Sequence, residues 1–464
     1  MRNIAIIGSG IAGLLTAHGL RRAGYEVTLY SDRTAADWRE RSRPTGTAGR
    51  FEPAVSYERE LGLAHWEHAC VKVEGVHLTF CPTPGNSLIT LTARLDQPGM
   101  AIDVRLQSSR WMDDLEARGG KIVIESVTVA RLDEIAAAHD LTIVAAGKAE
   151  LSSLFPRDAE RSVYDRPQRN LTMICARGAP HRFTGVPFVP VKFNLFGDTG
   201  EAFWVPYHHI EHGPSWNILF EAKPGGRMDR FMGVKSGAEA LSVAKEVIRD
   251  LMPWDSAWAK DFELSDKNGW LVGAFAPTVR KPVGKLPSGR VVTGVGDTLM
   301  LFDPIGGQGA NNGTKMARHL VASIVAREDR PFDEAWMTET FEGYWNDQGG
   351  VSYAFNNLLL EPITDAGKEL LIAQYGADGT KRDGKQAIAD GFAKNFADPR
   401  LATNLLTDGA AVKRFIAEKT GSSWILSAAR GRFGVAKNQI RQKLGLAPIH
   451  PAAPPGAFEV SSPS

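Results

Sequence analysis

The sequence predicts a two-lobed α/β fold with a helical C-terminal region, and three observations lead to this prediction. Residues 3–30 have the pattern of a strand, a glycine-rich turn, a helix and a second strand, which together form a βαβ unit. Residues 170–221 form short β-rich segments separated by Gly and Pro, which is typical of an antiparallel sheet. Residues from about 332 to 444 have a mainly helical pattern.

The composition is that of a globular protein of two or three domains. The chain has 464 residues, of which 43% are hydrophobic and 23% are charged. Its formal net charge of +1 gives no basic field for nucleic acid and no acidic excess typical of disorder. The cysteines Cys70, Cys81 and Cys175 are too scattered for a disulfide framework or a zinc site, so we expect a reduced, cytoplasmic location. No apolar run is long enough for a membrane span.

The first lobe begins with a buried, Ile-rich strand at residues 3–7. Apolar residues then recur at helical spacing over residues 11–20, and Gly24 ends that helix. A second strand follows at residues 26–30. Farther along, the patterns predict a helix over residues 103–118 and strands over residues 121–127 and 140–147.

The later elements return to the first lobe and then become helical. The patterns predict a helix over residues 236–252, a buried strand over residues 290–296 and a helix over residues 309–326. Residues 447–464 contain five prolines and no periodicity, so we expect them to be disordered. The expected regions are a discontinuous first domain (1–165 with 276–330), a β-rich domain (166–275), a helical region (331–446) and this tail.

A glycine pattern stands at the turn of the βαβ unit. Gly8, Gly10 and Gly13 follow the first strand and open the helix. Glycines permit a tight turn and close backbone approach, and a helix N-terminus offers free N–H groups to an anion. The pattern therefore predicts a pyrophosphate-binding turn, and the alternative is a glycine turn without a ligand.

The end of the second strand is where an acid would bind a ribose hydroxyl. Ser31 directly follows the strand, and Asp32 comes next, at about the expected spacing of roughly 20 residues past the last glycine. Asp32 is therefore the candidate for the ribose. Arg33 beside it either contacts a phosphate or is solvated.

A second glycine-rich segment lies about 290 residues later. A strand delivers Asp297, and the turn from Asp303 to Gly309 leads into another helix N-terminus. Asp297 could accept hydrogen bonds from the ribityl hydroxyls of a flavin, and N–H groups from Gly309 to Asn311 could stabilise negative charge on the flavin ring. A buried Asp at a structural turn is the alternative.

These motifs resemble those of flavoprotein monooxygenases with the p-hydroxybenzoate hydroxylase fold. Within that group, the chain is similar to the oxygenase component of two-component styrene and indole monooxygenases. The shared order of loose matches over residues 1 to about 320 makes the resemblance specific. It implies an FAD-binding first domain and a β-rich substrate-binding domain. The matches include Ser31 to Arg33, Asp103 to Leu106, Leu115 to Lys121, Gly147-Lys148, Pro167 to Arg169, Val205-Pro206 and Gly294 to Asn311.

The resemblance implies roles for individual residues. Pro304 would lie beside the reacting face of the flavin ring, and Arg43 would contact the flavin. After Arg43, the family pattern has an asparagine near the flavin, whereas this chain has small residues that include Gly46 and Ala48. This departure puts styrene itself in doubt as the substrate. The bulky Trp204 in the β-rich region also looks like a local change and could reshape the pocket. The residues implied to hold FAD are Gly8, Gly10, Gly13, Asp32, Arg33, Arg105, Gly147, Asp297, Gly306, Gly309, Ala310 and Asn311.

The resemblance also implies a reaction. A separate NADH-dependent flavin reductase would supply reduced FAD, which reacts with O2 to a C4a-hydroperoxide. That species would epoxidise or hydroxylate an apolar aromatic substrate that resembles styrene or indole. The chemistry needs a dry, shaped pocket more than a protein acid or base. The chain shows no evident catalytic triad, metal cluster or paired-carboxylate motif, which agrees with this expectation.

Three other functions remain as alternatives. A single-component aromatic hydroxylase would use NAD(P)H directly, but its mid-chain Asp-Gly segment is replaced here by Ala145 to Lys148. A flavin-dependent halogenase would carry a Trp-x-Trp-x-Ile-Pro signature, which the sequence lacks. The third alternative is a non-catalytic flavin-binding sensor. A homodimer is one option for the oligomeric state.

Two polar segments have more than one interpretation. His208 and His212 would share one face of a strand and could bind a metal, although a polar surface hairpin is the simpler interpretation. Near the C-terminus, a basic run without acids is either a solvated helix face, a docking site for an acidic reductase or a contact for FAD phosphates. This run comprises Arg430, Arg432, Lys437, Arg441 and Lys443.

Overall fold

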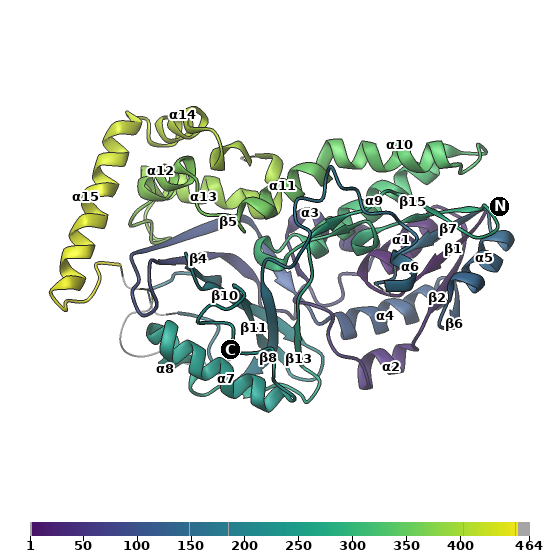
Figure 1. Cartoon of the computed structure of the whole chain (residues 1–464), viewed down its shortest axis with the longest axis horizontal. Coiled ribbons are helices and arrows are strands. Elements are labelled where there is room, and N and C mark those ends of the chain that lie inside the picture. Colours follow the sequence, from purple (N-terminus) through teal and green to yellow (C-terminus); the bar gives the residue numbers. More distant parts are fainter. Residues whose placement is uncertain (1, 148, 184, 402, 451, 453–464) are drawn as a thin grey trace. The chain divides into compact units, whose positions relative to one another are not determined.

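The computed structural model describes residues 2–147, 149–183, 185–401, 403–450 and 452. Its chain divides into two compact units, each assembled from three separate segments of sequence (Figure 1). The first unit comprises Met1–His68, Ile102–Pro167 and Phe275–Asn356. The second comprises Ala69–Ala101, Gln168–Ala274 and Asn357–Ser464.

A six-stranded sheet forms the centre of the first unit. β1 (Asn3–Ile7) lies in the middle and pairs in parallel with β2 (Glu26–Ser31) and β7 (Leu141–Val144). The βαβ unit predicted from the sequence is therefore confirmed. The full order is β15-β16-β7-β1-β2-β6. The outer strands are β6 (Lys121–Ile124), β16 (Val291–Gly294) and the antiparallel β15 (Val283–Lys285).

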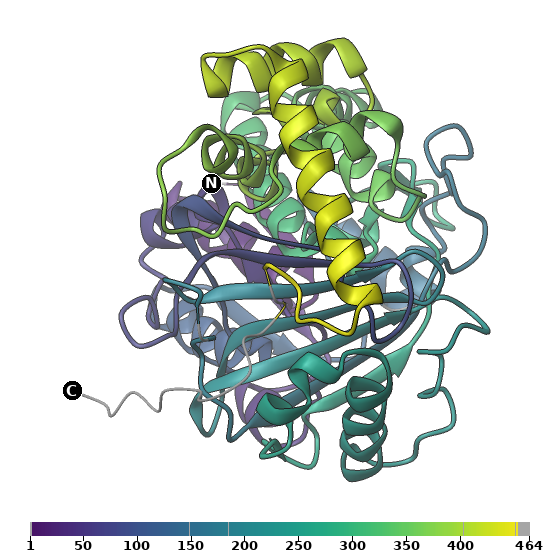
Figure 2. The ribbon, with the colours of Figure 1, turned by 90° about the vertical axis from the view of Figure 1, so that its left-hand side faces the viewer.

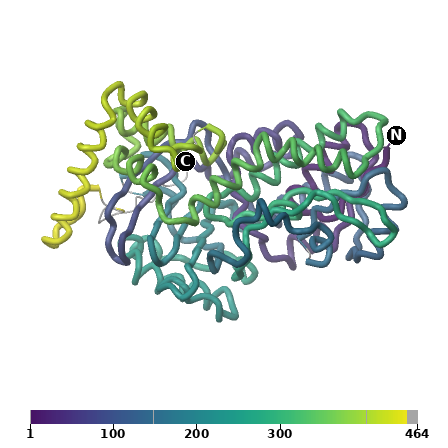
Figure 3. The backbone as a smooth tube through the Cα atoms, turned by 45° about the horizontal axis from the view of Figure 1, so that its top comes forward, coloured from purple at the N-terminus to yellow at the C-terminus, as the bar shows by residue number. Residues whose placement is uncertain are grey.

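Helices pack against this sheet and bury its apolar residues. α1 (Ile11–Arg22) and α4 (Val104–Ala117) are joined by a 2.8 Å hydrogen bond between His18 Nε2 and the Trp111 carbonyl. α9 (Gly309–Arg327) is the helix predicted after the second glycine-rich turn. Figure 3 traces the backbone, in which the purple N-terminal segment and the green segment after residue 300 belong to the same unit. The other helices are α2 (Ala35–Glu40), α3 (Glu52–Glu60), α5 (Val129–Ala138), α6 (Ala149–Ser152), α10 (Glu334–Tyr344) and α11 (Gly350–Leu358).

A mostly antiparallel sheet forms the centre of the second unit, as residues 170–221 predict. Its order runs β12-β8-β11-β10-β9-β4-β5, β13 also pairs with β8, and the β4–β9 pair is parallel. The strands are β4 (Val73–Cys81), β5 (Ile89–Ala101), β8 (Asn170–Arg177), β9 (Pro190–Phe196), β10 (Gly200–His209), β11 (Gly213–Ala222), β12 (Glu263–Leu264) and β13 (Trp270–Gly273).

The two faces of this sheet carry different aromatic residues because side chains alternate along a strand. Trp204 and Trp216 lie in the core that the sheet forms with α7 (Gly237–Leu251) and α8 (Ser256–Ala259). Phe193 and Phe203 lie on the opposite face, with ring centroids 4.8 Å apart. Trp204 is fully buried, and its Nε1 donates to Asp255 Oδ2 at 2.8 Å, so it is a core residue.

Four helices complete the second unit and agree with the helical pattern of the C-terminal region. They are α12 (Asp365–Ala373), α13 (Gly384–Ala397), α14 (Gly409–Thr420) and α15 (Trp424–Lys443), and Figure 2 shows the last of these in yellow at the front. Within the described ranges, no helix has the length and hydropathy that a membrane crossing requires. Of the tail expected to be disordered, residues 451 and 453–464 lie outside the described residues.

The unit boundaries differ from the expected domain limits in two places. Residues 69–101 join the second unit because β4 pairs with both β5 and β9 there. α10 and α11 belong almost entirely to the first unit, although the sequence places them in the helical C-terminal region. In both places, strand pairing and packing between segments that are far apart in sequence decide to which unit a segment belongs. The functional assignment of each unit stays a prediction.

Candidate functional site

The candidate site is built at the carboxyl ends of the parallel strands in the first unit. β1, β7 and β16 are neighbours in the sheet and run in the same direction. The segments that follow them are the Gly8 turn, the stretch from Ala145 to Gly147, and the turn that holds Asp297. This edge is where open α/β sheets bind ligands.

A different structural feature explains the presence of glycine at each of the three positions of the first turn. Gly8 has φ +118°, and a Cβ there would lie 2.5 Å from the Ala145 carbonyl oxygen. A Cβ on Gly13 would lie 2.1 Å from the Gly8 carbonyl oxygen. A Cβ on Gly10 would meet no atom within 4 Å, so this glycine faces open space. The first and third glycines close the turn, and the second leaves room for a ligand to approach the backbone.

The N-terminus of α1 is open to an anion. Gly10 is its N-cap residue, and no side chain caps the helix there. The first N–H groups of a helix have no partner within the helix, and they carry the positive end of its dipole. The glycine turn and this uncapped terminus therefore fit the pyrophosphate of a dinucleotide such as FAD.

Asp32 and Arg33 lie just beyond β2 and contact each other. Arg33 Nε donates to Asp32 Oδ1 at 2.9 Å, and the Arg33 guanidinium lies 4.6 Å from the Trp38 ring centroid. Ser31 is buried, and its Oγ lies 2.7 Å from Ser9 Oγ. The exposed Asp32 carboxylate is therefore the accessible acid at this strand end, where a ribose would be bound.

Asp297 directly follows Gly296 in a short 3-10 turn after β16. A Cβ on Gly296 would lie 2.8 Å from Ala12 Cβ, so this turn packs closely against α1. Burial by surrounding protein raises the pKa of Asp297 from its ordinary 3.8 to about 6, and the positive charge of Arg280 opposes the rise. The side chain is nonetheless accessible to solvent. An accessible but partly desolvated carboxylate fits a hydrogen-bond acceptor for ligand hydroxyls.

The turn with Pro304 is held by an asparagine that the sequence does not single out. Asn356 Oδ1 accepts from the Gly306 N–H at 3.1 Å, and Asn356 Nδ2 donates to the Asp303 carbonyl at 3.0 Å. The Asp303 side chain also accepts from the Ile305 N–H at 3.1 Å. These bonds fix the 3-10 turn Pro304–Gly306, with Pro304 partly exposed on it.

The N-terminus of α9, like that of α1, has no side-chain cap. Its N-cap residue Gln308 makes no capping bond and instead donates from Nε2 to the Gly306 carbonyl at 2.9 Å. A Cβ on Gly309 would meet no atom within 4 Å, and Gly309 and Ala310 are partly exposed. These N–H groups could stabilise negative charge on a bound ring.

Asn311 uses its side chain for the protein itself. Its Oδ1 accepts from the Phe51 N–H at 2.9 Å, and its Nδ2 donates to the carbonyls of Gly49 at 2.9 Å and Gly307 at 2.7 Å. The buried amide therefore joins the end of the segment 43–49 to the turn before α9. Any contribution of Asn311 to flavin binding comes from its backbone N–H.

The segment 43–49 ends in an unusual backbone conformation. Ala48 has φ +49°, which is uncommon outside glycine, and its carbonyl accepts from Arg50 Nη1 at 2.6 Å. Arg50 is fully buried and pairs with Glu58 at 2.5 Å. Arg43 is exposed, and a Cβ on Gly46 would meet no atom within 4 Å. The buried Arg50–Glu58 pair thus holds the end of the segment 43–49, and free space surrounds Gly46 in the middle of that segment.

The structure adds detail to two further predicted FAD contacts. Arg105 is buried, and its guanidinium binds the Asp103 carboxylate through Nε at 3.0 Å and Nη2 at 2.7 Å. Gly147 is exposed at the end of the short stretch after β7, at the same sheet edge as Gly8. The motif residue Lys148 lies outside the described residues.

One unit therefore contains all the predicted site residues. The three glycines, Asp297 and the turn at Pro304 lie at or beyond the carboxyl ends of neighbouring strands. Sequence reasoning missed Asn356, Arg280 and the Arg50–Glu58 pair. No local pattern marks these residues because their partners are remote in sequence or belong to an unassigned segment.

Near the β10–β11 turn, His212, which the sequence suggests as a metal ligand, and its neighbour His209 contact protein groups. His209 Nε2 lies 2.5 Å from Asp266 Oδ2, and His212 Nε2 lies 2.9 Å from the Ser265 carbonyl. The two rings stack, with centroids 5.4 Å apart. In the part of the chain that the structure describes, no group of three or more His, Cys, Asp or Glu residues could hold a metal ion.

Two family models match the chain. Residues 147–257 match "Styrene monooxygenase A putative substrate binding domain". Residues 6–57 match an NAD(P)-binding Rossmann-like domain and contain the glycine turn described above. The first match includes β8 to β11 and all of α7, and therefore much of the second unit.

Two curated relatives carry the same name. Styrene monooxygenase StyA from Pseudomonas fluorescens is 27% identical over 407 residues, which cover 86% of this chain and 93% of the relative. Styrene monooxygenase StyA from a Pseudomonas species is 28% identical over 339 residues, which cover 70% of this chain and 78% of the relative.

Solved structures of flavoproteins share the fold. A flavoprotein/dehydrogenase from Cytophaga hutchinsonii has a TM-score of 0.64 at 12% identity and covers 90% of this chain and 99% of its own. A flavin-dependent brominase has a TM-score of 0.56 at 14% identity and covers 95% of this chain and 100% of its own. At these identities the likeness shows the fold alone.

The comparisons confirm the resemblance and the α/β fold predicted from the sequence motifs. They agree with the site, where two uncapped helix N-termini, the glycine turn and Asp297 fit a flavin dinucleotide. The chain is a styrene monooxygenase-like, flavin-dependent monooxygenase.

Proposed function

We propose that this protein is the oxygenase component of a two-component system. A separate NADH-dependent flavin reductase supplies it with reduced FAD, and its substrate is an apolar aromatic compound that resembles styrene or indole. The names of the curated relatives support the substrate class. The observation that carries the proposal is the pairing, in one unit, of two uncapped helix N-termini with an accessible acid at the end of β16.

The residues of the first unit bind and orient the cofactor. N–H groups at the start of α1 bind the pyrophosphate, and Asp32 accepts from a ribose hydroxyl. Asp297 accepts from the ribityl hydroxyls, while N–H groups at Gly309 and Ala310 stabilise negative charge on the ring. Bound in its reduced form, FAD would supply the two electrons that activate O2, of which one oxygen atom enters the substrate and the other leaves as water.

Other residues position the substrate and exclude water. Pro304 is the candidate for contact with the reacting face of the ring, and Arg43, Gly46 and Ala48 belong to the second segment that would border it. In the second unit, Phe193 and Phe203 offer aromatic side chains to a substrate without charge, and buried Glu201, Glu221 and Asn217 lie on the same face of the sheet. A water-poor site also protects a reactive flavin from wasteful decay.

The first test is anaerobic titration of the purified protein with reduced and oxidised FAD, followed by rapid mixing of the reduced complex with oxygenated buffer. We expect tight binding of reduced FAD and a slow, multiphase return to oxidised flavin absorbance without substrate. A return as fast as that of free reduced FAD would contradict the proposal.

The second test adds styrene or indole to the reduced complex and analyses the products by chromatography. We expect oxygenated products when an NADH-dependent flavin reductase is present and none with NADH and this protein alone. Consumption of NADH or NADPH by the pure protein, stimulated by an aromatic substrate, would instead indicate a single-component hydroxylase.

A further inference from the structure

Among the residues that the structure describes, the helix α15 contacts its unit through one face. A Cβ on Gly431 would lie 2.0 Å from the Ile372 carbonyl oxygen, and a Cβ on Gly434 would lie 2.5 Å from the Tyr375 ring. Asn438 Nδ2 donates to the Leu88 carbonyl at 2.9 Å. Glycines at this contact let the helix backbone approach its neighbours closely. These contacts fix the rotation of α15 about its axis, so its opposite face points outward (Figure 2).

That outward face carries a stripe of large apolar side chains, which we name the α15 seam. The seam consists of Leu426, Phe433, Ile440 and Leu444, which are 45%, 73%, 58% and 69% exposed. They follow one another at intervals of seven, seven and four residues, so they lie along one side of the helix. Exposed apolar groups that line up in this way mark an interaction site more often than scattered ones do.

The spacing of the seam is that of a helix–helix contact. Ala429 and Ala436 lie between Leu426, Phe433 and Ile440, so large and small residues alternate with the three- and four-residue steps of a heptad. Small residues in such a row leave holes into which side chains of a second helix can insert. The seam is narrow, whereas a helix that lies on a lipid surface presents a broad apolar face.

Cations flank the seam on both sides. By their position on the helix, Arg430, Lys437 and Arg441 lie along one edge and Arg432 and Lys443 along the other. The sequence of α15 contains no Asp or Glu, although Arg432 pairs with Glu369 of α12. Two copies of α15 packed on each other would place cations opposite cations, which disfavours self-association through this seam.

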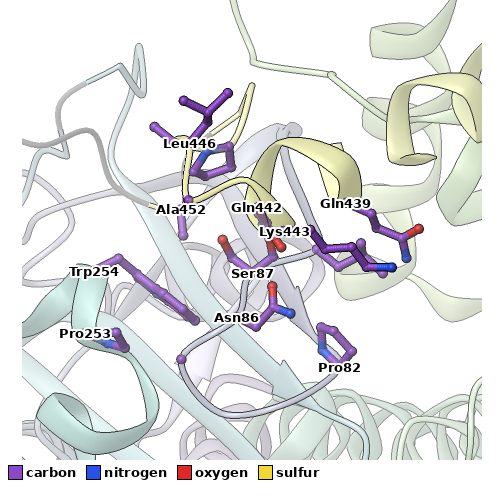
Figure 4. Close-up of a pocket in the computed structure, with 15 residues that line it drawn as sticks. Pro82, Asn86, Ser87, Pro253, Trp254, Gln439, Gln442, Lys443, Leu446 and Ala452 are labelled. Carbon is purple, nitrogen blue, oxygen red and sulfur yellow. The ribbon is translucent and has the colours of Figure 1, made fainter. Parts of the chain in front are cut away.

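The C-terminal end of α15 also borders a cavity of about 780 Å³ (Figure 4). Gln439, Gln442 and Lys443 line it from the helix, while Asn86 and Trp254 line it from the β4–β5 turn and the segment before α8. None of the four seam residues lines this cavity, so the cavity and the seam are separate features of the α15 surface.

From these features we infer that the α15 seam is a docking site for an acidic amphipathic helix of another protein. The partner helix carries apolar residues at its a and d positions and Glu or Asp at its flanking e and g positions. The charge of the flanks selects the acidic partner, and the alternation of large and small residues selects a helix. The inference does not depend on the proposed function, because no residue of the candidate flavin site takes part.

The test uses the full-length protein and a fluorescently labelled synthetic peptide of three heptads, with Leu at a and d and Glu at e and g. We expect saturable binding by fluorescence anisotropy, and at least tenfold weaker binding when NaCl rises from 50 to 300 mM. Phe433→Ser should weaken binding about 30-fold, since a central aromatic side chain typically dominates such contacts. Met232→Ser is the matched control because Met232 is 54% exposed and lies outside the seam.

Control measurements separate the seam from a general effect on folding. Phe433 is exposed, so Phe433→Ser should keep the thermal midpoint and the FAD affinity of the unchanged protein. A peptide of the same composition in scrambled order should not bind. Failure of the Leu/Glu peptide to bind, or equal binding by the scrambled peptide, would overturn the inference.

Two other occupants would also overturn it. Vesicles of phosphatidylglycerol that bind the protein through Phe433 while the peptide does not would indicate a lipid surface. A dimer that sedimentation detects, and that Phe433→Ser abolishes, would indicate a second copy of this chain.

Discussion

Asn311 shows how a residue at the candidate site can act through the backbone around it. Its side chain makes three hydrogen bonds to Gly49, Phe51 and Gly307, and it thereby joins two segments that are remote in sequence. The sequence motif indicates that Asn311 belongs to the site. The motif does not indicate that the Asn311 side-chain amide binds protein backbone groups, because these bonds depend on the position of Gly49 and Phe51 at the end of the segment 43–49.

The contacts of Asn311 lead to a prediction about stability and cofactor affinity. Asn311→Ala should lower the free energy of unfolding by about 2–3 kcal/mol, since it removes three hydrogen bonds of roughly 1 kcal/mol each that the buried amide makes to backbone groups. It should also weaken FAD binding, because Gly307 and Gly49 border the predicted flavin contacts. Urea denaturation and a flavin titration measure the two effects.

The neighbouring Asn312 provides the matched control. Its Oδ1 accepts one bond, from the Tyr344 hydroxyl at 2.7 Å, and that hydroxyl also contacts the Asn312 carbonyl at 3.1 Å. Asn312→Ala should therefore lower the stability by only about 1 kcal/mol and leave FAD affinity unchanged. Equal effects of the two variants on FAD affinity would contradict the positioning role of Asn311.

Asp297 leads to a prediction about pH. Because burial raises its pKa to about 6, the carboxylate takes up a proton as the pH falls through 6 and loses part of its capacity to accept hydrogen bonds. FAD should therefore bind more weakly at pH 5 than at pH 7.5, and Asp297→Asn should remove this pH dependence. Arg280→Met removes the opposing positive charge, so the midpoint should move above 6. A titration by flavin fluorescence at several pH values tests both statements.

The raised pKa of Asp297 also makes folding stability depend on pH. A rise in pH lowers the stability of the ligand-free protein, whereas it strengthens FAD binding. An unfolded Asp titrates near 3.8, so between about pH 3.8 and 6 the folded state holds the extra proton, and stability falls as the pH rises. Above pH 6 the folded protein retains the full unfavourable burial of the charge. Asp297→Asn should therefore stabilise the ligand-free protein at pH 8 by about 1 kcal/mol, a value reduced because water screens this accessible group. No gain is expected near pH 3.8.

At the scale of elements, a buried ion pair joins β9 to the turn before α8. Lys192 and Asp255 are both fully buried and in contact, and Asp255 Oδ2 also accepts from Asn194 Nδ2 at 3.0 Å and from Trp204 Nε1 at 2.8 Å. Burial lowers the pKa of Lys192, and the Asp255 charge opposes that shift. The pair therefore depends on both partners.

Removal of one partner should strongly destabilise the second unit. Lys192→Met leaves the Asp255 charge uncompensated in the core and should lower the free energy of unfolding by about 3–5 kcal/mol. The double variant Lys192→Met with Asp255→Asn should recover much of that loss. Urea denaturation followed by tryptophan fluorescence is a suitable measurement because Trp204 and Trp258 lie in this core. A double variant as unstable as the single one would contradict this explanation.

The elements also show what local sequence could and could not predict. The order β1, α1, β2 follows from hydrophobic spacing and a glycine pattern within 30 residues, and the structure confirms it. The hairpin of β4 and β5 was not assigned, although Val76, Leu78 and Phe80 alternate with polar residues as in a strand. Even with that signal, its place in the second unit depends on pairing with β9, more than 100 residues away.

The residues of the candidate site likewise fall into those that local sequence predicts and those that it does not. The glycine turn and Asp297 were predictable because their chemistry is written in consecutive residues. Asn356 was not, because its role arises from contacts with Asp303 and Gly306, about 50 residues earlier. The burial of Arg105 against Asp103 likewise depends on packing, which the motif alone does not describe.

At the scale of the whole molecule, two buried histidines make stability sensitive to acid. Burial lowers the pKa of His18 in the first unit to about 4 and that of His77 in the second unit to about 3. As the pH falls below 6.5, the unfolded chain binds protons at both positions while the folded protein does not. Each histidine should therefore reduce stability by about 1.4 kcal/mol per pH unit between 6.5 and its folded pKa.

Variants of the two histidines assign this acid sensitivity to each unit. His77→Gln and His18→Gln should each flatten the dependence of unfolding free energy on pH, by about 0.1 proton at pH 7.5 and about 0.8 proton at pH 6, because the unfolded histidine titrates at 6.5. Urea denaturation at several pH values measures this slope. Asp297 contributes a slope of the opposite sign in this range, and this contribution cancels when each variant is compared with the unchanged protein. An unchanged slope in either variant would show that its histidine is protonated in the folded protein.

The interleaving of the two units has a consequence for synthesis on the ribosome. The first unit contains three separate segments, and its central sheet gains β16 only after residue 294 has been made. The second unit needs β13 to complete its sheet, so it waits for residue 273. A nascent chain therefore carries both sheets unfinished for more than half of its translation. Its exposed strand edges during that time are where chaperones would bind, and a stop codon before residue 270 leaves no complete unit behind.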